Sequence, residues 1–278
     1  MLYKKNSEKT LSDALFRNPT CEYRATPFWA WNCKMTDEIL TEQIPLLKEM
    51  GFGGFHMHSR TGMANQYLSP EFMDLVKACV EKAKDEDMLA WLYDEDRWAS
   101  GAAGGYVTKN LKYRQRMLSF TKQYEPTAVA DPQTAIEQDL CWAVAAYDVK
   151  LNASGELVGY TRLSAGETGD NVWYAYLRPT PPDPWFNNQT YVDTLNPEAI
   201  GKFIEITHET YKNACGGEFD KTVPAIFTDE PQFTHKATLR FATDKADVAL
   251  PWTDDLANTF DATYPGEHLL ESVPELIW

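Results

Sequence analysis

Short apolar runs alternate along the chain with segments that have the periodicity of amphipathic helices. Apolar runs begin near residues 26, 53, 88 and 223. In the clearest helical segment, Ser69 is a typical N-cap and Pro70 a typical first helical residue. Its apolar positions recur every three or four residues, as on one buried helix face: Phe72, Leu75, Val76, Cys79, Val80 and Ala83. Such an alternation predicts a parallel sheet with right-handed crossovers, either an open sheet or a closed barrel.

Two more helices are predicted from their ends. Thr36 is placed to cap a helix that Gly51 ends, and Asn196 to cap one that continues to Tyr211. A further strand is expected near residue 190, which brings the predicted parallel strands to five.

The middle of the chain has a different pattern. Segments within residues 111–178 read as antiparallel strands, and Asn152–Gly155 has the composition of a hairpin turn. The stretch 178–185 is too rich in proline for regular structure. We therefore expect three parts: a first part of a β/α barrel over 1–110, an inserted antiparallel β subdomain with its linker over 111–185, and the continuation of the barrel over 186–278.

Composition excludes several classes of protein. Of the 278 residues, 44% are hydrophobic and 24% charged, which is typical of a globular chain rather than a disordered one. The formal net charge of -15 argues against nucleic acid or an anionic membrane as a partner. There is no apolar stretch long enough to span a bilayer, and the five cysteines form no C-x-x-C pair. We expect a cytoplasmic protein without a disulfide framework; the oligomeric state stays open.

Polar residues gather where the predicted strands end, which is where parallel α/β folds place their active sites. At the end of the second run, His58 and Arg60 are candidate hydrogen-bond donors to a polar ligand. His56 and His58 share one side of their strand and would suit a metal-dependent amidohydrolase, but few other histidines are present to complete such a site. This reading is kept as a lesser alternative.

The third run ends in three adjacent acids followed by Arg97 and Trp98. Acids in that position can hold sugar hydroxyls, act as a base or bind Ca²⁺. Another strand ends in Asp229 and Glu230. Hydrolysis of a glycosidic bond needs two carboxyl groups on opposite sides of the bond, and two strand ends here supply acids. Glu230 is the predicted catalytic acid, because Pro231 disfavours a helical continuation after it.

Four stretches resemble a known family. PFWAWN, MGFGGFHMHSR, LAWLYDEDRWASGAAGG and VPAIFTDEP look like the barrel domain of α-L-rhamnosidase-type glycoside hydrolases of family 106. The resemblance implies a (β/α)8 TIM-type barrel, calcium-assisted hydrolysis and a carboxylate general acid. Because only five of eight strands are recognised before the chain ends, the barrel is expected to be incomplete, and the second carboxylate can lie outside it.

The sequence therefore predicts an α/β glycoside hydrolase that acts on an oligosaccharide or polysaccharide, with an α-L-rhamnoside as the substrate that the resemblance implies. The alternative is a non-catalytic carbohydrate-binding domain, or a fragment of a larger glycosidase. The predicted catalytic residues are Glu230, Asp94 and Asp96. The predicted substrate-binding residues are Trp31, His58, Arg60, Tyr93, Glu95, Arg97, Trp98 and Asp229. Calcium is the only cofactor expected, with no ligands assigned to it.

Overall fold

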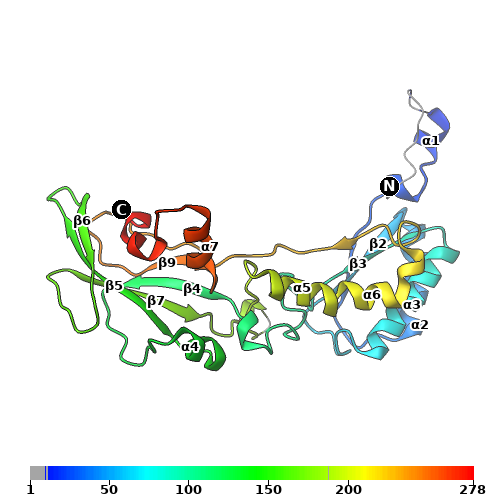
Figure 1. Cartoon of the computed structure of the whole chain (residues 1–278). Helices are drawn as coiled ribbons and strands as arrows, with labels where there is room; N and C mark the ends of the chain where they lie inside the picture. The colour runs from blue at the N-terminus through cyan, green and yellow to red at the C-terminus, as the bar shows by residue number, and fades with distance from the viewer. Residues whose placement is uncertain (1–9, 11, 187) are drawn as a thin grey trace. The chain divides into compact units, whose positions relative to one another are not determined.

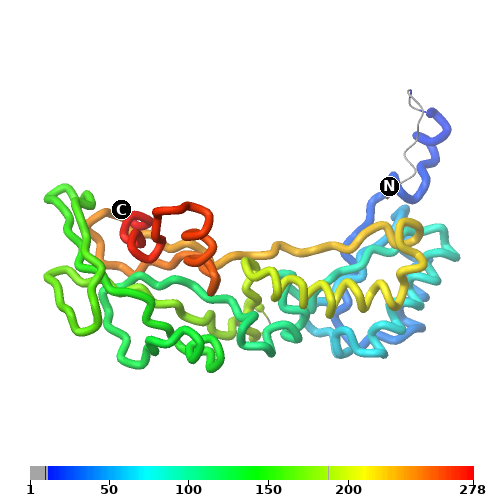
Figure 2. Tube along the Cα trace, in the orientation of Figure 1, coloured from blue at the N-terminus to red at the C-terminus, as the bar shows by residue number. Residues whose placement is uncertain are grey.

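The structure is a computed structural model that describes residues 10, 12–186 and 188–278. It divides the chain into two compact units. The first unit comprises residues 1–107, 183–189 and 201–231, and the second comprises residues 108–182, 190–200 and 232–278. The trace in Figure 2 can be followed by colour as the chain passes several times from one unit to the other. Each unit has its own hydrophobic core.

The first unit contains a four-stranded parallel sheet of order β1-β2-β3-β8. Its strands are β1 (Phe28–Trp31), β2 (Gly54–Ser59), β3 (Leu89–Tyr93) and β8 (Ile226–Phe227). The register pairs Trp31 with Ser59 and Tyr93 with Phe227. The carboxyl ends of the strands therefore meet at one edge.

Helices cover one face of this sheet. They are α2 (Asp37–Glu49), α3 (Pro70–Asp85) and α6 (His208–Cys215), which Figure 1 shows beside the strands. Thr36 caps α2 and Ser69 caps α3 through their side-chain oxygens, as predicted. All six apolar positions predicted for α3 are buried. The alternation along a strand then sends the other side chains, including His56, to the opposite face.

That opposite face is aromatic. Phe28 has its ring centroid 5.1 Å from that of His56, 5.0 Å from that of His58 and 5.1 Å from that of Phe227. His56 stacks on Trp91 with centroids 4.9 Å apart. These contacts fix the imidazoles in a layer of rings.

Two predicted elements are wrong. Residues near 190 form only isolated bridges, such as that between Val192 and Arg114, because β8 occupies the edge of β3 that a further strand would need. The helix predicted from Asn196 to Tyr211 is two helices, α5 (Pro197–Ile206) and α6. They meet at Thr207, whose hydroxyl donates a hydrogen bond to the Phe203 carbonyl oxygen; such a bond competes with regular helix.

The second unit contains a five-stranded antiparallel sheet of order β6-β5-β7-β4-β9. Its strands are β4 (Arg116–Thr121), β5 (Trp142–Leu151), β6 (Leu157–Arg162), β7 (Val172–Pro179) and β9 (Val248–Trp252). The antiparallel character and the hairpin at Asn152–Gly155, where Gly155 has a φ of 82°, agree with the sequence analysis. However, β9 comes from the segment expected to continue the barrel, and it pairs with β4 instead.

Short elements complete the chain. The α-helices are α1 (Asp13–Arg17), α4 (Pro132–Gln138) and α7 (Leu256–Thr263). The 3-10 helices are η1 (Cys21–Tyr23), η2 (Leu111–Tyr113), η3 (Pro184–Phe186), η4 (Gly216–Glu218), η5 (Leu269–Glu271) and η6 (Val273–Leu276). Residues of η5 and η6 pack into the core of the second unit. The architecture is mixed α/β, with one parallel and one antiparallel sheet.

Among the described residues, no helix combines the length and the apolar character that crossing a bilayer requires. All five cysteines are free thiols.

Candidate functional site

The candidate site lies at the carboxyl edge of the parallel sheet, where β2, β3 and β8 end. His58 is the fifth residue of β2 and Tyr93 the last of β3, and Asp229 follows β8 by two residues. Their side chains meet. The Tyr93 hydroxyl donates a hydrogen bond of 3.2 Å to Asp229 Oδ2, and His58 Nε2 lies 4.0 Å from the same oxygen.

This trio is buried and held in place by stacking. The rings of His58 and Tyr93 are 3.8 Å apart between centroids and inclined by only 16°. Burial lowers the pKa of His58 and raises that of the Tyr93 phenol, the latter with a further increase from the charge of Asp229. Both shifts favour the uncharged forms of the imidazole and the phenol.

Asp94 is wholly buried and joins the ends of β3 and β8. Its Oδ1 accepts a hydrogen bond from the Ser100 hydroxyl, and its Oδ2 lies 2.7 Å from Thr228 Oγ1 and 2.9 Å from His208 Nε2. Ser100 also exchanges hydrogen bonds with the backbone of Asp229. The carboxylate thus accepts hydrogen bonds from three side chains, and through Ser100 it is linked to the backbone of Asp229.

Glu95 has a comparable structural role. Its carboxylate accepts five backbone N–H groups, those of Asp96 and of residues 101–104, of which four have distances between 2.8 and 2.9 Å. To direct these donors inward the loop adopts left-handed conformations at Arg97, Ala103 and Gly104. Burial raises the pKa of Glu95 to about 7, although the N–H donors act in the opposite direction.

Partly exposed side chains lie around this buried layer. The guanidinium of Arg60 lies over the Trp98 ring at 5.2 Å, and Arg97 Nε is 3.3 Å from Asp96 Oδ1. Burial raises the pKa of Asp96, against the effect of Arg97. Trp185, which is 56% exposed, contacts Trp98 edge to face with centroids 5.3 Å apart. This aromatic pair offers the kind of surface on which sugar rings stack.

Glu230 is exposed and has a φ of 39°, a left-handed conformation that is uncommon outside glycine. It follows the buried Asp229 directly. Strained backbone of this kind concentrates at functional sites. Among the carboxylates of the predicted site, Glu230 is the most accessible to a ligand, since the others are at most partly exposed.

Not every predicted residue can contact a substrate in this structure. Trp31 is 1% exposed and packs against Phe72 in the core on the helix side of the sheet, so almost none of its side chain is open to a ligand, and its substrate-binding role stays a prediction. Asp94 and Glu95 are buried and engaged by protein groups, and their predicted catalytic and binding roles stay predictions. His58, Tyr93 and Asp229 come together as a buried layer, and Arg97 is partly exposed.

Sequence reasoning missed Ser100, Thr228, His208 and Trp185. His208 is the first residue of α6, where its side chain can reach the strand ends. Trp185 lies in the proline-rich stretch that was taken only as a linker. A tryptophan directly after Pro184 in a stretch without regular structure was the available signal.

The calcium expectation can be tested against the donor set. Both oxygens of Asp94 and of Glu95 already accept hydrogen bonds, so the three adjacent acids do not converge on one point where an ion could bind. Within the described ranges, no group of three or more His, Cys, Asp or Glu side chains is arranged to hold a metal ion. The residues present do not fit Ca²⁺, and we assign no step to it.

Comparisons with known proteins give a structural likeness. No protein-family model matches the chain. No curated protein matches it either. Among solved structures, a rhamnosidase from Novosphingobium sp. PP1Y is similar with a TM-score of 0.50 and 12% sequence identity. The similarity covers 95% of this chain and 42% of the rhamnosidase, so the chain spans about two fifths of that protein's length. At this identity the likeness concerns the fold.

Proposed function

We propose that the protein is a glycoside hydrolase, that its parallel sheet is part of a (β/α)8 barrel, and that Glu230 is its general acid. The observation that carries the proposal is the exposed, conformationally strained Glu230 beside the buried Asp229 at the carboxyl ends of parallel strands. The fold likeness to a rhamnosidase supports an α-L-rhamnoside as the first substrate to try.

In the proposed reaction, the Glu230 carboxyl group donates its proton to the glycosidic oxygen as the bond to the anomeric carbon breaks. The leaving group departs as an alcohol, and water adds to the anomeric carbon after losing a proton to a second carboxylate. Asp96 is the candidate for that carboxylate, because Asp94 and Glu95 are saturated by protein donors. Arg60 and the Trp98–Trp185 pair are proposed to bind the sugar.

The function is tested by measuring hydrolysis of aryl α-L-rhamnosides and related aryl glycosides. Glu230→Gln is expected to lower kcat/KM by about 10²- to 10⁴-fold, the usual contribution of a general acid. Glu42→Gln, a matched change at an exposed position of α2, should leave it unaltered. Full activity in the Glu230→Gln variant would overturn the assignment.

A second candidate function is carbohydrate binding without cleavage. It is favoured by the saturation of Asp94 and Glu95, which leaves few free carboxylates at the sheet edge. The two functions differ in one result: a binding domain is stabilised against heat by a sugar such as L-rhamnose, because ligands stabilise the folded state, yet releases no product from any aryl glycoside.

A further inference from the structure

A cleft of about 1030 Å³ lies within the second unit. Its walls are α4, α7 with the three residues before it, and the start of α5, and Trp142 at the beginning of β5 also lines it. This volume is at the upper end of the range for small-molecule sites. The cleft belongs to the antiparallel unit and involves none of the residues proposed for hydrolysis.

The walls are connected beneath the cleft by one buried guanidinium. Arg116 Nη1 lies 3.3 Å from Asp254 Oδ2 on the α7 side, and its Nη2 lies 3.7 Å from Asp139 Oδ1 at the end of α4. The third wall is attached through Asp193, which accepts a 2.6 Å hydrogen bond from Thr253. The cleft is therefore formed before any ligand arrives, which reduces the entropy that binding costs.

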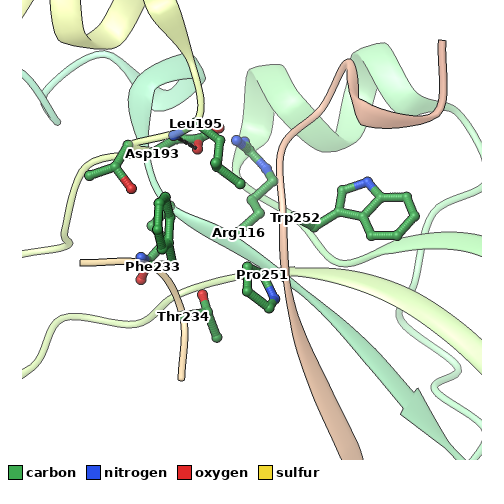
Figure 3. A pocket seen from close by; sticks show the side chains of 9 residues that line it. Arg116, Asp193, Leu195, Phe233, Thr234, Pro251 and Trp252 are labelled. Atoms are coloured by element: carbon green, nitrogen blue, oxygen red, sulfur yellow. Dashed lines mark hydrogen bonds between the residues drawn. The ribbon is translucent and has the colours of Figure 1, made fainter. Parts of the chain in front are cut away.

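Figure 3 shows Arg116 beside Asp193, Leu195 and Trp252 in a neighbouring hollow. That hollow has no room for a water molecule. The space available to a ligand is the larger cleft, on which Leu195 and Asp254 border.

Negatively charged groups outnumber positively charged ones in the cleft. Four carboxylates and one ammonium group line it: Glu137, Glu198, Asp254, Asp255 and Lys112. Arg116 offsets the charge of Asp254, but the exposed side chain of Glu198 makes no hydrogen bond or ion pair with the described residues. Asp254 Oδ1 is buried and has no hydrogen-bond partner in the described part of the chain. A ligand in the cleft that supplies a donor and positive charge would pair with the exposed Glu198 carboxylate, whereas the buried Asp254 oxygen has no surface open to it.

Trp142 supplies an apolar, aromatic surface. It is partly exposed and lines the cleft together with Ile136 and Leu256. The face of an indole ring attracts cations as well as apolar groups. The lining thus combines excess negative charge with an aromatic wall.

We propose that this cleft binds an organic ammonium compound whose apolar part contacts Trp142 and whose cationic group is held by the carboxylates that include Glu198. A neutral ligand would leave the excess negative charge uncompensated, and an anion would be repelled by it. The proposal does not depend on hydrolysis by the first unit.

Three probes of similar shape test it: benzylamine, benzyl alcohol and benzoate, titrated calorimetrically into the full chain. Benzylamine should bind about tenfold more tightly than benzyl alcohol, and its affinity should fall at high salt. Its advantage in affinity over benzoate should be larger still. Equal affinity for the three probes would show an apolar hollow without charge selection and overturn the proposal. Failure of benzylamine to bind would overturn it as well.

Two matched variants localise the binding. Glu198→Gln should weaken benzylamine about threefold to fivefold and leave benzyl alcohol unchanged, as expected for the loss of one partly screened charge. Glu205→Gln changes an exposed glutamate of the same helix outside the cleft, and should alter neither affinity. Equal affinities of the Glu198→Gln variant and the unaltered protein for benzylamine would contradict the proposed site.

Discussion

The two units use buried charge in different ways. In the parallel unit, Asp94 and Glu95 are buried among hydroxyls, an imidazole and backbone N–H groups. In the antiparallel unit, Arg116 is buried between the carboxylates of Asp139 and Asp254. The first arrangement fixes the loop that follows a strand, at the edge where parallel sheets place their chemistry. The second arrangement joins the walls of a cleft. Burial of a carboxylate therefore does not by itself identify a catalytic acid.

The largest expected effect comes from removing the buried carboxylate of the parallel unit. Asp94→Ala leaves Ser100, Thr228 and His208 without their acceptor and should destabilise the first unit by about 3–5 kcal/mol. Amide hydrogen exchange should show the loss of protection in β3 and β8, with the strands of the antiparallel sheet unaffected. Asp74→Ala, at an exposed position of α3, should change stability by less than about 0.5 kcal/mol. Equal effects of the two substitutions would contradict the structural role of Asp94.

The two sheets differ in whether a glycine of one of their strands has room for an added methyl group. A Cβ at Gly54 in β2 would lie 2.4 Å from the Leu89 carbonyl oxygen, whereas a Cβ at Gly159 in β6 meets nothing within 4 Å. Gly54→Ala should therefore destabilise the protein by about 1–3 kcal/mol. Gly159→Ala should be neutral or stabilise it by up to about 1 kcal/mol through the unfolded state. Urea denaturation of both variants checks this, and tolerance of Gly54→Ala would contradict the close approach of β2 and β3.

The smallest effect is a difference in pH dependence. Burial lowers the folded-state pKa of His56 and His58. Below about pH 6.5 the unfolded chain therefore binds more protons than the folded one. The contribution of the two histidines to stability is lost as the pH falls through their folded-state pKa values. Burial raises the pKa of Asp193 and Asp254, so their contribution is lost as the pH rises above about 3.9 through the folded values.

Glu95 changes stability with pH in the opposite direction between about pH 4.3 and its raised pKa. Subtracting the pH–stability curve of the His58→Gln variant from that of the unaltered protein removes the contribution of Glu95 and leaves that of His58. The stability difference between the unaltered protein and His58→Gln should shrink as the pH falls below about 6.5. A stability difference that stays constant between about pH 8 and about pH 5 would show that the pKa of His58 is the same in the folded and unfolded chains.

Local signals predicted most of the individual elements. Thr36 and Ser69 cap helices as expected, and the periodicity of α3 matches its buried face, because these patterns depend on residues close in sequence. Pairing between strands depends on distant residues instead. The segment near Val192 is buried and apolar, but β8 occupies the edge where it was expected.

The sequence predicted where the candidate site lies better than it predicted what each of its residues contacts. The acids after β3 do lie at the carboxyl edge of the sheet, as their place after an apolar run indicates. Their partners could not be predicted, because Ser100 and His208 reach Asp94 only through the fold. A run of three acids therefore gave no sign that two of them are saturated by protein donors.

The central claim is that Glu230 donates a proton to a departing sugar oxygen. The most direct measurement compares kcat/KM of the unaltered protein and Glu230→Gln for two aryl glycosides of the same sugar, with dinitrophenol and phenol as leaving groups. Dinitrophenol needs little protonation, so we predict a loss of less than about tenfold for it and of about 10³-fold for phenol. An equal loss for both leaving groups would contradict the assignment of Glu230 as the general acid.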